Sequence, residues 1–311
     1  MRTVGLVYSD KFLAHGSETF HPENPQRLKA IVAALRDSGI YDHLKLIDPE
    51  PARETDILTN HSPSLYERAR STRGQIPGDF DRDTYYCAES FDTAMLAVGG
   101  VLKAGRLVLS GELDSAFCAV RPPGHHAEYD RIMGFCLFNN IAILARMLKS
   151  EFGLERIAIL DWDGHHGNGT QKSFYDSDMV HFCSLHNFPF YPGSGRADEI
   201  GEGRGEGYTL NFPLPYGMGD REFIEAVQQW ASAMDQYRPE TILISAGFDA
   251  YTDDPYVGLN VTLDGFNTIM RIVKDTAEKH CRGKIISILE GGYVYDFLGR
   301  AVTEHIKILM E

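Results

Sequence analysis

Two aspartates and one histidine have the side-chain types and the spacing of a metal-binding centre. Asp163 and His165 are two residues apart at the end of an apolar run, where an extended backbone turns both side chains to the same side. Asp249 ends another apolar run and supplies a third ligand. Three protein ligands leave one coordination position open, which is typical of a catalytic zinc site. The alternative is that Asp163 caps a helix and Asp249 ends a strand; it suits either residue alone but not all three together.

A pair of adjacent histidines could supply acid–base chemistry. His125 and His126 follow Arg-Pro-Pro-Gly, in which the prolines stiffen the loop and the glycine lets the backbone approach a ligand closely. Asp161 can orient one ring and Asn168 the other. Because a carboxylate raises an imidazole pKa more than an amide does, we predict that His126, paired with Asn168, is neutral and acts as the base. His125 is then the more cationic ring.

Three aromatic residues stand beside glycine or proline after predicted strands. Tyr293 follows Gly291 and Gly292, and its hydroxyl could donate to an oxyanion. The alternative is a buried ring whose hydroxyl has found a partner in the core. Phe135 and Tyr191 could wall a slot for a narrow apolar chain, although core packing explains each of them nearly as well.

The elements that must position these residues alternate between strand and helix. Short β-branched runs bounded by polar or glycine turns predict buried strands at residues 3–9, 115–121, 156–163, 180–186, 241–249 and 284–290. Apolar residues at three-to-four spacing predict helices at residues 25–37, 89–109, 137–152, 220–237 and 263–281. This order predicts an α/β fold with a doubly wound, mostly parallel sheet flanked by helices.

Ligands of open parallel sheets bind outside the carboxyl ends of the strands, and the reactive residues here all follow strand ends. The sequence has no internal repeat or low-complexity tract, so we expect residues 1–311 to form a single catalytic domain. The glycine-rich stretch 192–207 lacks phosphate-cradle spacing, and a surface or site-wall loop is the default interpretation.

Composition narrows the functional classes. The 311 residues are 43% hydrophobic and 24% charged, as in globular proteins, and the net charge of −14 argues against nucleic-acid binding. The start of the chain lacks a signal-peptide pattern and no uncharged 18-residue apolar stretch occurs, so we expect no membrane association. Five scattered cysteines without Cys-x-x-Cys fit a cytoplasmic protein without disulfides.

Taken in order, six motifs resemble the histone deacetylase superfamily, specifically the class II and bacterial acetylpolyamine amidohydrolase-like branch. They are His-Pro-Glu-Asn-Pro-x-Arg-Leu (21–28), Arg-Pro-Pro-Gly-His-His-Ala (121–127), Gly-Phe-Cys-x-Phe-Asn-Asn (134–140), Asp-Trp-Asp-x-His-His-Gly-Asn-Gly-Thr-Gln (161–171), Ser-Ala-Gly-Phe-Asp-Ala (245–250) and Glu-Gly-Gly-Tyr (290–293). The resemblance implies a single-domain arginase-deacetylase fold.

The resemblance also implies roles for individual residues. It implies one zinc ion per chain on Asp163, His165 and Asp249, with His126 as general base and acid, His125 as its electrostatic partner and Tyr293 on the oxyanion. It further implies an acyl-lysine tunnel lined by Gly134, Phe135 and Tyr191, with Tyr256 at its rim and Arg27 in an inner channel. A structural potassium ion is implied on Asp161, Asp163, His165, Ser184 and Leu185.

The expected activity is zinc-dependent removal of acetyl or related acyl groups from acyl-lysine or small acylated amines. Acetylpolyamine hydrolysis is an alternative, but Tyr256 stands where the polyamine-specific relative carries glutamate, so this choice stays open. A non-catalytic acyl-group binding protein is disfavoured, because a binder needs no acid, base and oxyanion donor together. A binuclear manganese ureohydrolase is also disfavoured, because its additional carboxylate ligands are replaced by Gly167 and Tyr251. The sequence leaves the physiological substrate and the oligomeric state open.

Overall fold

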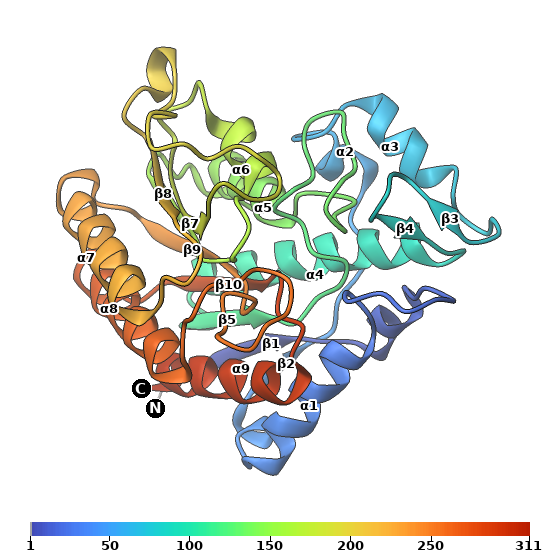
Figure 1. Ribbon diagram of the computed structural model, residues 1–311, viewed down its shortest axis with the longest axis horizontal. Coiled ribbons are helices and arrows are strands. Elements are labelled where there is room, and N and C mark those ends of the chain that lie inside the picture. Colours follow the sequence, from blue (N-terminus) through green and yellow to red (C-terminus); the bar gives the residue numbers. More distant parts are fainter. Residues whose placement is uncertain (1) are drawn as a thin grey trace.

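The computed structural model describes residues 2–311, and at its centre lies one eight-stranded sheet (Figure 1). Every neighbouring pair of strands in this sheet is parallel. The strand order is β2-β1-β5-β10-β9-β6-β7-β8. The strands are β1 (Val4–Val7), β2 (Lys45–Ile47), β5 (Ser115–Cys118), β6 (Ile157–Asp161), β7 (Val180–Asn187), β8 (Thr209–Leu214), β9 (Thr241–Ala246) and β10 (Ile285–Leu289).

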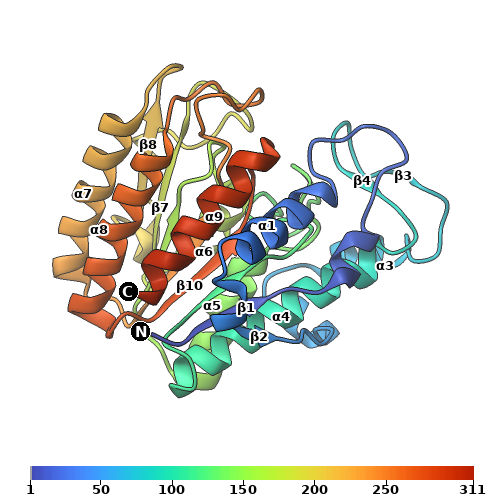
Figure 2. The same ribbon diagram turned by 90° about the horizontal axis from the view of Figure 1, so that it is seen from below.

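Helices cover both faces of the sheet (Figure 2). One face carries a continuous layer in which each helix contacts the next: α1 (Gln26–Asp37), α9 (Tyr295–Met310), α8 (Leu263–Cys281) and α7 (Asp220–Tyr237). The other face carries α4 (Ser90–Ser110), α5 (Asn140–Phe152) and α6 (Asn168–Phe174). Two short helices, α2 (Glu54–Ile57) and α3 (Pro63–Arg70), and a small antiparallel pair, β3 (Gly78–Asp79) and β4 (Tyr85–Tyr86), lie apart from the sheet.

Burial on both faces explains why the central strands are continuously apolar. All residues of β5, β6, β9 and β10 are buried. Helix α4 is long and apolar enough to cross a membrane by length and composition, the one such helix between residues 2 and 311. Two thirds of its apolar window is buried inside the fold, where it packs against α5 and the sheet, and its composition is that of a core helix.

The predicted doubly wound sheet is confirmed, and all six predicted strands and five predicted helices are present. Most predicted strands run one to three residues beyond the observed ends, because the residues after them turn into site loops. The two edge strands, β2 and β8, were not predicted, and neither were the short β3–β4 pair and the helices α2, α3, α6 and α9. β2 has only three residues, and β8 contains a proline that a strand tolerates only at an edge.

Candidate active site

The predicted site residues converge because the strands that carry them are neighbours. In the sheet order, β5, β10, β9 and β6 stand side by side. Their carboxyl ends lead to the His125–His126 loop, to Tyr293, to Asp249 and to the 161–168 segment respectively. The four loops therefore meet at one edge of the sheet, as the strand-end rule predicts.

Asp163, His165 and Asp249 form a cluster whose ligand-type atoms lie within 4.8 Å of one another, the one cluster of this kind in the part of the chain that the structure describes. The Nδ1 atom of His165 lies 3.1 Å from Asp163 Oδ1 and 2.9 Å from Asp249 Oδ2. The second oxygen of each carboxylate accepts a backbone N–H, from Gly291 at 2.7 Å and from Gly164 at 2.7 Å. These bonds turn the remaining oxygens toward one point.

The donor set fits a divalent cation. Asp163 and Asp249 are fully buried, and two carboxylates with one imidazole are zinc ligands. Burial lowers the pKa of His165, but hydrogen bonds to the two carboxylates outweigh it and raise the pKa to about 10. The surroundings therefore favour positive charge at the point that the three side chains share.

The two histidines of the pair have the partners that the sequence analysis proposed. His125 Nδ1 lies 2.9 Å from Asp161 Oδ2, and His126 Nδ1 lies 2.7 Å from Asn168 Oδ1. Burial lowers the pKa of His125, but the Asp161 and Asp163 carboxylates outweigh it and raise that pKa well above its ordinary value. Burial and the neighbouring His125 hold the pKa of His126 well below it. Both directions agree with the prediction of a neutral base beside a cationic partner.

Glu290, which was not predicted as a site residue, fixes the loop that carries this pair. Its Oε2 atom accepts the backbone N–H groups of Gly124 at 2.8 Å and His125 at 3.2 Å. The carboxyl group is fully buried, which raises its pKa to about 7. The signal was present in the motif, since Glu290 begins the Glu-Gly-Gly-Tyr run that ends at Tyr293.

Arg27 lies behind Tyr293 and does not line the pocket. It is fully buried, donates from Nε to the Gly292 carbonyl at 2.8 Å, and also donates to the Glu290 carbonyl. Its guanidinium carbon lies 5.2 Å from the centre of the Tyr293 ring. Arg27 thus fixes the turn that presents the phenol. Burial raises the pKa of that phenol well above its ordinary value, so the hydroxyl keeps its proton and can donate it in a hydrogen bond.

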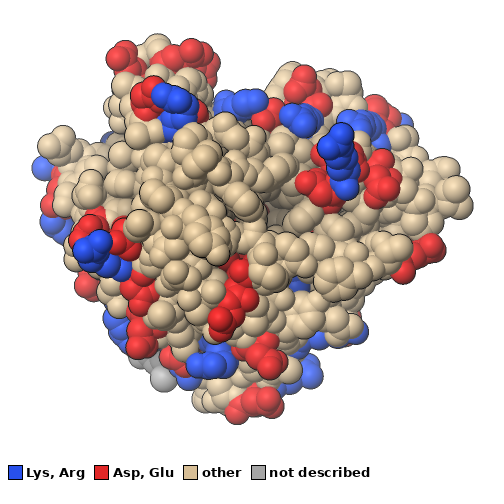
Figure 3. Space-filling model, viewed as in Figure 1, with Lys and Arg blue, Asp and Glu red and all other residues tan. Residues whose placement is uncertain are grey.

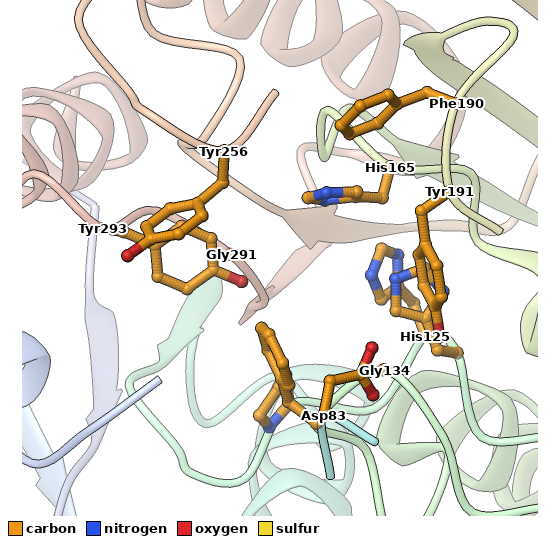
Figure 4. A pocket seen from close by; sticks show the side chains of 12 residues that line it. Asp83, His125, Gly134, His165, Phe190, Tyr191, Tyr256, Gly291 and Tyr293 are labelled. Atoms are coloured by element: carbon orange, nitrogen blue, oxygen red, sulfur yellow. The ribbon is translucent and has the colours of Figure 1, made fainter. Parts of the chain in front are cut away.

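These groups open onto a pocket of about 220 Å³. Tyr256 and Tyr293 lie on one side of it, opposite Tyr191, Phe190 and His125 (Figure 4). The predicted wall residues all line it: Gly134, Phe135, Tyr191 and Tyr256. Phe190 and Asp83 line it as well and were missed, because nothing in their local sequence distinguishes them from other loop residues. On the surface, the hollow is surrounded mainly by uncharged residues (Figure 3).

Gly134 is in the pocket wall for a steric reason. Its φ of 57° is in the left-handed region, and a Cβ atom there would overlap the ring of His126. Phe135 follows with φ 67°, which is rare for a residue with a side chain and turns its ring to the pocket.

Two of the residues expected to hold potassium are neighbours in the sheet. Asp161 on β6 is paired in register with Ser184 on β7, and both are buried, as is Leu185. The Ser184 hydroxyl lies 2.9 Å from His186 Nδ1. The ion itself stays a prediction.

An α/β sheet whose strand ends present a buried carboxylate–imidazole cluster, a histidine pair and a phenol defines a hydrolase class. Comparison with known proteins gives the family. Residues 21–309 match the family model described as histone deacetylase domain. The fold matches the crystal structure of the HDA15 HD domain with a TM-score of 0.94 and 34% identity, over 99% of this chain and 88% of that one.

Two curated relatives have a similar extent. The chain is 41% identical to a probable deacetylase of Archaeoglobus fulgidus, over 93% of this chain and 81% of the relative. It is 38% identical to a histone deacetylase-like amidohydrolase of Pseudomonas aeruginosa, over 92% and 77%. The chain therefore belongs to the histone deacetylase family. It is a hydrolase that acts on amide bonds, and the predicted fold is confirmed.

Proposed function

We propose that the protein is a zinc-dependent deacetylase that removes acetyl or related short acyl groups from acylated lysine or small acylated amines. The observation that carries the proposal is the cluster of Asp163, His165 and Asp249 beside His126 and Tyr293 in one narrow pocket. A metal-binding centre, a neutral base and a phenol donor are the parts that amide hydrolysis requires.

Asp163, His165 and Asp249 would hold the zinc ion, which when bound polarises the amide carbonyl and acidifies water. His126 removes a proton from the attacking water and returns it to the leaving amine. Asn168 Oδ1 accepts from Nδ1 of His126, which leaves Nε2 free to take that proton.

Tyr293 donates its hydroxyl hydrogen to the oxyanion that forms from the carbonyl oxygen. His125, held cationic by Asp161, stabilises the negative charge that develops nearby. The pocket walls are largely aromatic, from Phe135, Phe190 and Tyr191, and they suit the methylene chain of an acylated amine.

A small acylated polyamine is a second candidate substrate, favoured by one observation. Asp83 lines the pocket, and its carboxylate lies at the lower edge of the opening in Figure 4. A carboxylate at this place would attract a substrate that carries a second positive charge.

The proposal also includes a location and a second ion. A cytoplasmic location fits the five cysteines, none of which forms a disulfide. A potassium ion is proposed beside Asp161 and Ser184.

The packing around Gly167 and Tyr251 also disfavours binuclear metal chemistry. A Cβ atom at Gly167 would overlap Asp161 Oδ2, so a carboxylate side chain there would have to displace Asp161 from its contact with His125. Tyr251 stacks on Phe297 with ring centres 3.5 Å apart and offers no ligand.

The test measures kcat/KM of the zinc-loaded protein on an acetyl-lysine peptide, acetylputrescine and acetylspermidine. We expect release of acetate that stops after chelation and returns with zinc. A preference for the polyamines would select the second candidate. No release from any acyl amide, with one zinc bound per chain, would instead identify an acyl-group binding protein and overturn the proposal.

A further inference from the structure

The glycine-rich loop at residues 192–207 leaves the pocket wall and joins β7 to β8. Phe190 and Tyr191, which line the pocket, directly precede it. The ring of Phe190 stacks on His165 at 5.7 Å, and the ring of Tyr191 stands edge-on to His126 at 5.2 Å. The position of this wall relative to the reacting groups therefore depends on what holds the loop.

Glu199 closes the first turn of the loop. Its carboxylate accepts the backbone N–H groups of Gly195 at 3.1 Å and Arg196 at 3.0 Å. The same carboxylate accepts the side-chain N–H of Gln171, on helix α6, at 2.6 Å. One side chain thus ties the loop both to itself and to the helix that follows the metal-ligand segment.

Gln171 extends the connection to the residue beside the metal-site histidine. Its Oε1 atom lies 2.9 Å from His166 Nε2 and accepts from Asn211 Nδ2 at 2.7 Å. His166 Nδ1 in turn lies 2.8 Å from the Ser194 hydroxyl, back in the loop. Ser194, His166, Gln171 and Glu199 therefore form a ring of contacts that closes through the backbone N–H of Gly195, the residue after Ser194.

The loop also packs directly on this ring of contacts. Gly195 has φ 90°, and a Cβ atom there would lie 2.6 Å from His166 Cδ2. The carbonyl of Gly195 accepts from His186 Nε2 at 2.9 Å. Backbone, glycine contact and side-chain bonds all fix the loop at one position.

We propose that Glu199 and Gln171 are a positioning pair that holds the Phe190–Tyr191 wall. Because this wall stands against His165 and His126, where the acyl carbonyl must lie to react, its position limits the size of the acyl group as well as the path of the methylene chain. Neither residue lines the pocket, so their effect on selectivity would be transmitted through the loop. The inference rests on the proposed deacetylase function, because it concerns the acyl group of that reaction.

The test compares Glu199→Gln with the matched control Asp198→Asn. Glu199→Gln places an amide N–H₂ group against the N–H donors of Gln171 or the loop backbone, and so breaks the ring of contacts. Asp198 is exposed, and its side chain pairs with Arg196. Both variants remove one negative charge from adjacent positions. The readouts are kcat/KM on acetyl- and butyryl-lysine peptides and hydrogen exchange of the backbone in residues 188–207.

We expect Glu199→Gln to lower the ratio of kcat/KM for acetyl- over butyryl-lysine peptide about 10-fold or more. This is the size of the effect that an added methylene group has on kcat/KM in an apolar pocket. Exchange in residues 188–207 should rise, while Asp198→Asn resembles the wild type in both readouts. The double variant Glu199→Gln with Gln171→Glu restores a donor–acceptor pair of reversed direction and should recover the preference.

Equal selectivity and equal exchange in Glu199→Gln and Asp198→Asn would overturn the inference. So would faster exchange without any change in acyl preference. Hydrogen exchange does not depend on activity, so an inactive wild type with the predicted exchange pattern would refute the deacetylase function and leave the loop clamp standing.

Discussion

Replacing Glu23 by glutamine should destabilise the protein far more than an exposed substitution of the same kind. Glu23 is fully buried, and both of its oxygens accept from the guanidinium of Arg121, one of them at 2.8 Å. Arg27 lies 3.4 Å from it, and the Tyr85 hydroxyl donates at 3.5 Å. Glutamine keeps the shape of the side chain but leaves the buried Arg121 without its counter-charge.

Breaking one side of a buried ion pair costs about 3–5 kcal/mol. The control is Glu67→Gln, which removes an ion pair with Arg70 whose two side chains are 53% and 54% exposed. An exposed pair of this kind contributes about 0–1 kcal/mol. Urea unfolding of wild type and both variants measures the difference. A loss of less than about 1 kcal/mol in Glu23→Gln would refute the reasoning.

The effect of pH follows from the same contacts. Burial raises the pKa of Glu23, but Arg121 outweighs it and lowers the pKa from 4.5 to about 2. The ionised carboxylate therefore contributes stability that is fully present above the unfolded value and is lost as pH falls through the folded value. The stability gap between wild type and Glu23→Gln should narrow as pH falls from about 6 to about 3. A gap that widens in acid would contradict this sign.

Three further changes test the site. Tyr293→Phe should lower kcat by on the order of 10²–10³ with a small change in KM, because the phenol acts on the oxyanion; Tyr256→Phe, a rim residue, is its control, and equal losses would refute the role. Gly134→Ala should lower activity strongly, because the added Cβ atom would overlap His126. Its control is Gly39→Ala, where φ is 74° and an added Cβ atom would meet nothing within 4 Å; this variant tests backbone strain alone and should keep its activity. Chelation should abolish turnover and lower the melting temperature, with zinc restoring both; an ion at about 1,000 times its Kd adds about 4 kcal/mol. A chelated protein with full activity would exclude the metal mechanism.

Local spacing was enough to predict the central part of the site. Asp163 and His165 share one extended segment, and Asp249 ends a strand, so their convergence required only the parallel sheet and its carboxyl edge. The pairings of His125 and His126 could be predicted because Asp161 and Asn168 flank the same strand end.

Residues that act through long-range contacts could not be assigned in this way. Glu290 meets the backbone of Gly124, 166 positions away, and Glu23 meets Arg121, 98 positions away. A single sequence does not show such pairings, because the partner is fixed by the order of strands and not by spacing. The edge strands β2 and β8 were missed for a related reason, since each is only half covered and lacks a continuous apolar pattern.

Charge balance in the core connects these long-range contacts to the chemistry. Glu23 is balanced by Arg121, and Asp161 by His125, so each of these buried carboxylates has a cationic partner within the chain. Asp163 and Asp249 both contact His165, whose pKa they raise to about 10, and His125 lies 3.8 Å from Asp163 but is already paired with Asp161. A divalent cation bound there would supply the missing positive charge and release that proton. The acidic end of the sheet would then be most stable with its metal bound, and stability and catalysis would depend on the same ion.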